Sequence, residues 1–118
     1  GAELYHRYLT EHQMAEELGF DAILLNEHHQ SAFCMGAQPN IEAAILARIT
    51  SKVRITLIGN VLPIHEDPLF LAEQLAMIDV ISKGRLVTGW VRGNGRESDG
   101  SRFGKRLRRA ARGKTRAT

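Results

Sequence analysis

Residues 19–29, with the sequence GFDAILLNEHH, decide the fold of this chain. Gly19 is typical of the left-handed residue that follows the end of a helix. The apolar run Ala22–Leu25 has no alternating polar residue, which predicts a parallel strand that is covered on both faces. Residues 26–29 (NEHH) then leave the carboxyl end of this strand, where α/β folds place their chemistry.

Apolar spacing along the rest of the chain predicts three helices that alternate with three strands. The expected elements are a helix over 3–18, a strand over 22–25, a helix of about 13 residues from Pro39, a strand over 53–61, a helix between Asp67 and Gly84, and a strand over 85–91. Asp67 is expected to cap the third helix, with Pro68 at its first position. Strands recur about every 30 residues, which is the size of a βαβ unit.

Each predicted helix has an apolar stripe. The stripes consist of Leu4, Tyr8, Ala15 and Leu18 in the first helix, Ile41, Ala44, Ile45 and Ile49 in the second, and Leu71, Leu75 and Ile78 in the third.

The order αβαβαβ fits either a doubly wound parallel sheet or a βα barrel. A dinucleotide-binding sheet should show Gly-x-Gly-x-x-Gly after its first strand, and nothing similar follows Leu25. The sequence Gly93-Asn94-Gly95 comes only after the third strand and has Ser98 in place of the third glycine. The periodicity alone leaves both architectures open.

Four segments, in this order and spacing, resemble the bacterial luciferase-like, flavin-dependent monooxygenase family. They are residues 15–21 (AEELGFD), 26–29 (NEHH), 59–63 (GNVLP) and 72–86 (AEQLAMIDVISKGRL). The resemblance runs from about residue 4 to about residue 98 and implies an incomplete (β/α)8 TIM barrel with parallel strands. A complete barrel needs about 250 residues, roughly twice the 118 present, so we expect a fragment. The opening residue, Gly1, agrees with this expectation.

The resemblance implies a site that binds reduced FMN and uses molecular oxygen. His28 matches the family's catalytic histidine, and imidazole can both donate and accept protons near neutral pH. Gly59 and Asn60 match a segment that passes close to the flavin ring and often contains a non-proline cis peptide. Arg92 matches a position that contacts the flavin phosphate, which a guanidinium can bind through two hydrogen bonds. The alternatives are an ordinary polar residue at 28, a simple bulge at 59–60 and a surface arginine at 92.

A metal site is the other specific interpretation of Glu27, His28 and His29. Zinc needs ligands that face the same way, whereas adjacent residues of an extended segment point apart. We therefore expect no metal here.

Charge is distributed unevenly. Residues 99–118 contain eight lysines or arginines and one acidic residue, a net charge of +7, so the formal +3 of the whole chain leaves −4 for residues 1–98. This basic tail could bind nucleic acid or be a disordered end, but we favour a third interpretation, a frame change or truncation near Ser98 that replaced the native continuation. We therefore divide the chain into a barrel domain over 1–98 and a non-native tail over 99–118.

Composition also limits compartment and partners. The single cysteine excludes an intrachain disulfide, and no apolar run of roughly 20 residues could span a bilayer. We expect a cytoplasmic flavoprotein that uses a small-molecule substrate, oxygen and a flavin reductase, binds neither membrane nor nucleic acid, and could form a homodimer. The alternatives are an F420-type oxidoreductase of the same superfamily and a non-catalytic remnant, because three or four strands cannot close a barrel.

Overall fold

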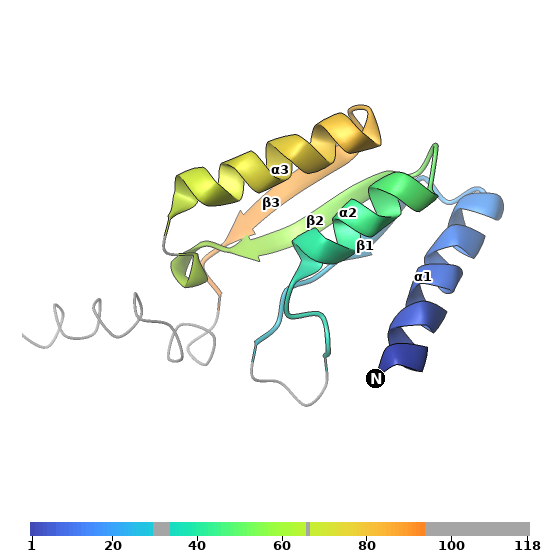
Figure 1. Ribbon diagram of the computed structural model, residues 1–118, viewed down its shortest axis with the longest axis horizontal. Helices are drawn as coiled ribbons and strands as arrows, with labels where there is room; N and C mark the ends of the chain where they lie inside the picture. The colour runs from blue at the N-terminus through green and yellow to red at the C-terminus, as the bar shows by residue number, and fades with distance from the viewer. Residues whose placement is uncertain (30–33, 66, 94–118) are drawn as a thin grey trace, which may run out of the picture.

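The computed structural model describes residues 1–29, 34–65 and 67–93 and contains a sheet of three parallel strands in the order β1-β2-β3 (Figure 1). The elements in chain order are α1 (Ala2–Glu17), β1 (Ala22–Leu25), α2 (Pro39–Ile49), β2 (Arg54–Val61), the 3-10 helix η1 (Leu62–Ile64), α3 (Pro68–Ser82) and β3 (Leu86–Val91). The predicted αβαβαβ order is confirmed. The basic tail and its boundary at residue 98 lie outside the described residues.

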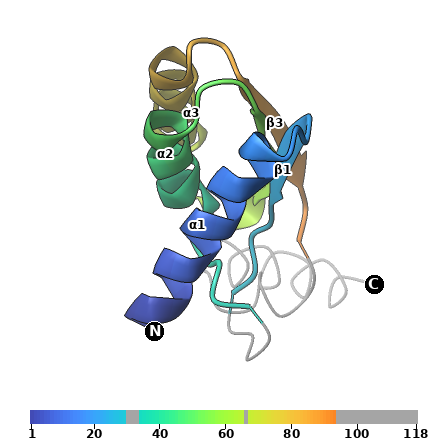
Figure 2. The same ribbon diagram turned by 90° about the vertical axis from the view of Figure 1, so that its right-hand side faces the viewer.

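Helices α2 and α3 cover one face of the sheet, and the described residues leave the opposite face open (Figures 1 and 2). The core lies between these helices and the covered face. It comprises Ile23, Leu25, Ala43, Leu46, Ala47, Val53, Ile55, Leu57, Leu71, Leu75 and Ile78. Leu24 and Ile58 point away from the helices and are 63% and 54% exposed. The expectation that β1 is covered on both faces is therefore wrong, because the described residues supply helices to one face only.

The predicted apolar stripe is buried in α3, whereas in α2 only Ala44 and Ile49 of the stripe pack against the core, as partly buried residues. Leu71, Leu75 and Ile78 are buried in α3. In α2, Ile41 and Ile45 are exposed, and the buried apolar positions are Ala43, Leu46 and Ala47. Helix α2 is apolar on two sides, and the side with the smaller residues lies on the sheet. Helix α1 has no buried residue at all.

The ends of α3 follow the predicted chemistry. The Asp67 carboxylate accepts a hydrogen bond from the Leu69 N–H at 2.9 Å, and Pro68 occupies the first turn. The helix ends at Lys83, which has the left-handed φ of 60°, and Gly84 follows with a φ of 80°. None of the helices in the described part of the chain combines the length and apolar character needed to cross a membrane.

The Glu16 carboxylate fixes the end of helix α1, which also packs Leu9 against the core. Glu16 accepts hydrogen bonds from the backbone N–H groups of Ser51, Lys52 and Val53, at distances between 2.7 and 3.0 Å. Burial alone would raise the pKa of Glu16, but the hydrogen bonds from Val53, Lys52 and Ser51 outweigh it and lower the pKa from 4.5 to about 2. The carboxylate thus ties the end of α1 to the turn before β2.

Arg85 joins the amino-terminal end of the sheet to the ends of two helices. Its guanidinium donates to the carbonyl oxygens of Ala47, Thr50, Val53 and Ser82 and to the Thr50 hydroxyl, at 2.8 to 3.0 Å. These acceptors include the carbonyls that the last turns of α2 and α3 leave free. Arg85 is therefore a structural residue at the edge of the sheet opposite the candidate site.

Candidate functional site

All the residues predicted for the site lie at the carboxyl edge of the sheet. His28 follows the end of β1, Asn60 is the next-to-last residue of β2, and Arg92 directly follows β3. The parallel register places Leu25 opposite Leu57 and, further along, Asn60 opposite Trp90. Because parallel strands end at one edge, these three side chains come from adjacent positions on the fold.

The alternation of buried and exposed residues in β1 continues beyond the end of the strand. Leu25 and Glu27 are buried, whereas Leu24, Asn26 and His28 are exposed. Because successive side chains of an extended segment point to opposite sides, His28 lies on the open face together with Leu24. The His28 backbone N–H donates to the Gly36 carbonyl at 3.2 Å, which ties this segment to the loop before α2.

Glu27 is the residue of this edge that sequence reasoning did not place in the site. Its side chain is only 3% exposed. One carboxylate oxygen, Oε1, lies 2.6 Å from His29 Nε2, and the other, Oε2, accepts a hydrogen bond from the Val61 N–H at 3.0 Å. The carboxylate therefore joins the segment after β1 to the end of β2. The spacing of Glu27 and His29, two residues apart on an extended segment, was the available signal for their pairing.

His65 approaches the same carboxylate from the turn after η1. Its Nε2 lies 3.9 Å from Glu27 Oε2, beyond hydrogen-bond distance, and this buried atom has no hydrogen-bond partner among the described residues. Within residues 1–29, 34–65 and 67–93, no group of three or more histidine, cysteine or acidic side chains is arranged to hold a metal ion.

Gly59 lies in β2 directly against the backbone of Gly89 in β3. The peptide bond between Ile58 and Gly59 is cis, in the segment where the resemblance implied such a bond. A bulge occurs at the same place, because the register shifts between Leu57 and Asn60. A Cβ on Gly59 would lie 3.0 Å from the Gly89 carbonyl oxygen, so any larger residue here would have to displace the neighbouring strand by a few tenths of an ångström.

Asn60 and Arg92 reach different surroundings. Asn60 is 0% exposed, and neither its Oδ1 nor its Nδ2 has a hydrogen-bond partner among the described residues. Arg92 is exposed, as is His28. The structure thus brings the three residues to one edge of the sheet but puts only His28 and Arg92 at its surface.

The comparisons with known proteins agree with this fold. The chain belongs to the luciferase-like monooxygenase family, because the model of that family matches residues 2–111. It is 37% identical over 91 residues to the oxygenase component of a flavin-dependent trigonelline monooxygenase from Acinetobacter baylyi. It is also 34% identical over 91 residues to the alkanal monooxygenase alpha chain of Photorhabdus laumondii. Each alignment covers 77% of this chain, and the chain spans about a quarter (25%) of each relative's length.

A solved structure shows the same arrangement of strands and helices. The oxygenating constituent of 3,6-diketocamphane monooxygenase from Pseudomonas putida, in complex with FMN, superposes with a TM-score of 0.72 at 22% identity. The superposition covers 76% of this chain and 24% of that one. The predicted fold class, part of a βα barrel, is confirmed. The family match continues to residue 111, and the proposed domain boundary at residue 98 stays a prediction.

Proposed function

We propose that this chain forms part of a flavin-dependent monooxygenase that binds reduced FMN at the carboxyl edge of its sheet. The observation that carries the proposal is the exposure of His28 on the open face, directly after β1 and beside the end of β2. Family membership supports the same chemistry, because the relatives named above are monooxygenases and one is described as flavin-dependent. Bound reduced FMN would supply the electrons with which molecular oxygen is activated.

Each of the site residues is proposed to have a separate role. His28 is proposed as the catalytic residue, since an exposed imidazole can give and take a proton at the reacting centre. Arg92 is proposed to bind the FMN phosphate through charge-assisted hydrogen bonds. The backbone at Gly59 and the amide of Asn60 are proposed to contact the flavin ring. Asn60 can do so only after its side chain turns outward, because it is fully buried in the described chain.

The wider assignments belong to the same proposal. The substrate is a small organic molecule, a separate flavin reductase supplies reduced FMN, and the protein acts in the cytoplasm, where a homodimer could form. Two alternatives remain: the chain could use F420 instead of FMN, or it could be a remnant without activity. The following experiment separates them.

The first test is an anaerobic titration of the chain with reduced FMN, followed by flavin fluorescence. We expect saturable binding, and we expect Arg92→Ala to weaken FMN binding by about 10- to 100-fold while leaving reduced riboflavin binding unchanged, because riboflavin lacks the phosphate. Saturable binding of F420 alone would move the cofactor assignment to deazaflavin. Binding of neither flavin would overturn the proposal in favour of the remnant.

The second test concerns His28. Mixing the complex with oxygen in a stopped-flow instrument measures how fast the bound flavin reoxidises. We expect His28→Gln to slow the reoxidation by about 100-fold with little change in FMN affinity. General acid–base groups contribute to the reaction step rather than to binding. The exposed His6 on α1 provides a matched control, and His6→Gln should leave the rate unchanged. An unchanged rate in His28→Gln would remove His28 from the catalytic role.

A further inference from the structure

The carboxylate of Glu27 is buried at the carboxyl edge of the sheet and connects two segments that are 34 residues apart. We propose that Glu27 is a positioning residue that holds His28 on the open face. The proposal rests on the proposed function, because it assigns a support to the catalytic histidine named there.

The burial of Glu27 requires hydrogen-bond donors. A carboxylate removed from water is costly unless its oxygens are paired. Both oxygens of Glu27 are satisfied, with the His29 ring at 2.6 Å from Oε1 and the Val61 N–H at 3.0 Å from Oε2. This arrangement is specific, because each donor occupies a different oxygen and the two donors belong to different segments of the chain.

These contacts fix both neighbours of His28. Glu27 is tied to Val61, which is paired with Val91 of β3, and His29 is tied to Glu27. Both side chains therefore stay on the same side of the extended segment, and the residue between them must point to the opposite side.

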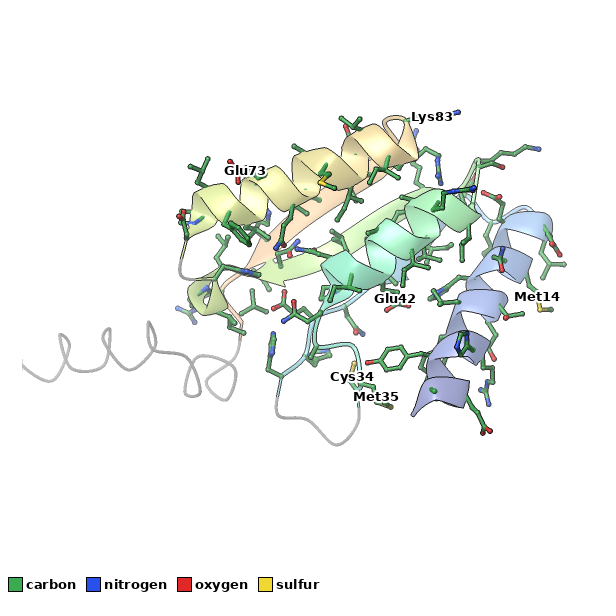
Figure 3. The ribbon with its side chains drawn as sticks, in the orientation of Figure 1. Met14, Cys34, Met35, Glu42, Glu73 and Lys83 are labelled. Carbon is green, nitrogen blue, oxygen red and sulfur yellow. The ribbon has the colours of Figure 1, made fainter. Side chains whose placement is uncertain are left out.

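The loop before α2 adds a backbone contact to this arrangement. The Gly36 carbonyl accepts from the His28 N–H, and the Gly36 N–H donates to Cys34 Sγ at 3.3 Å. Figure 3 labels Cys34 and Met35 on this loop, below α2 and beside α1. The backbone of His28 is thus held from the loop side, while Glu27 holds the segment from the sheet side.

Hydrogen exchange of the Val61 amide reports directly on the proposed contact. In Glu27→Ala, we expect exchange at Val61 to accelerate by at least about tenfold relative to Ile55, because Val61 loses its acceptor. Ile55 is a suitable internal reference, since its N–H donates to the Arg85 carbonyl far from Glu27. Glu27→Gln keeps a carbonyl oxygen that can accept from Val61, and we expect it to restore part of the protection.

The position of the His28 ring is the second readout. We expect the imidazole resonances of His28 to shift in Glu27→Ala and to return toward the wild-type values in Glu27→Gln. In the complex with reduced FMN, the reoxidation rate should fall in the same order as these shifts. Glu42→Ala is the matched control, because the Glu42 carboxylate lies between α1 and α2, where its partner is His12 at 3.4 Å (Figure 3).

The outcomes separate this proposal from the proposed function. Unchanged exchange at Val61 in Glu27→Ala would overturn the positioning role of Glu27. Accelerated exchange with unshifted His28 resonances would also overturn it, because Glu27 would then have a purely structural role. Should Glu27→Ala not fold, Glu27→Gln decides against wild type: we expect exchange at Val61 to be faster and the His28 resonances to be shifted, each by less than in a full loss of the acceptor, and wild-type values for both would overturn the proposal. A chain that binds no flavin would refute the proposed function, whereas the exchange and the ring resonances would still decide whether Glu27 positions His28.

Discussion

Replacement of Glu16 by glutamine tests how helix α1 is attached to the sheet. The carboxylate accepts from three consecutive backbone N–H groups, and α1 has no fully buried residue, with Leu9 packing against the core as a partly buried side chain. A carboxyl whose pKa falls from 4.5 to about 2 stabilises the fold by about 3 kcal/mol at most. Because Glu16 is partly exposed, solvent screening reduces this to roughly 1–2 kcal/mol, which is the loss that we expect in Glu16→Gln.

The same substitution should change how stability depends on pH. The pKa of Glu16 is lower in the folded chain than in the unfolded chain, so ionised Glu16 favours the folded state. Its contribution is complete above pH 4.5, declines as the pH falls from 4.5 toward about 2, and is absent below that value. The difference between wild type and Glu16→Gln should therefore be largest near neutral pH and should disappear in acid.

Urea unfolding followed by circular dichroism, repeated from about pH 6 to about pH 2, measures this difference. The neighbouring Glu17 is exposed and gives a matched control, and we expect Glu17→Gln to stay within about 0.5 kcal/mol of wild type. A loss in Glu16→Gln that persists unchanged in acid would refute the reasoning, because the effect would then not come from the charge.

Two further substitutions test the sheet. Arg85→Ala removes five hydrogen bonds, four to the ends of α2 and α3 and one to the Val53 carbonyl before β2, and should lower the free energy of unfolding by about 3 kcal/mol, against about 0.5 kcal/mol or less for the exposed Arg48→Ala. Equal losses in thermal unfolding would contradict the role given to Arg85. Gly59→Ala puts a Cβ 3.0 Å from the Gly89 carbonyl oxygen and should cost about 1–3 kcal/mol, whereas a Cβ on Gly36 meets nothing closer than 3.4 Å. If urea unfolding finds Gly59→Ala as stable as Gly36→Ala, the strands are further apart than described.

The sequence predicted the elements well where several local signals coincide. The strand Ala22–Leu25 was correct to the residue, because a helix-ending glycine precedes it and polar residues follow it. The start of α2 at Pro39 was also correct. The buried face of α2 was not predicted, because apolar residues occur on two sides of that helix and local periodicity does not say which side meets the sheet.

The sequence was sufficient to predict at which edge of the sheet the candidate site lies. It was not sufficient to predict which of its residues contact one another. The positions of His28, Asn60 and Arg92 after or near strand ends follow from the element boundaries. The hydrogen bond from the Val61 N–H to Glu27 joins residues that are 34 positions apart. It depends on the register between β1 and β2, which no local sequence pattern predicts. The complete burial of Asn60 has the same cause, since the bulge at Gly59 changes which residues of β2 are covered.

The two glycines that face each other between β2 and β3 also limit how these strands can align. A Cβ on Gly59 would meet the Gly89 backbone, and a Cβ on Gly89 would lie 3.1 Å from the Leu57 carbonyl oxygen. Sliding β3 by one residue would bring the Cβ of Thr88 or Trp90 into a space where a Cβ lies only 3.1 Å from a backbone carbonyl oxygen. The two glycines therefore favour one register between β2 and β3. That register also sets the position of Arg92 relative to His28 along the strand direction.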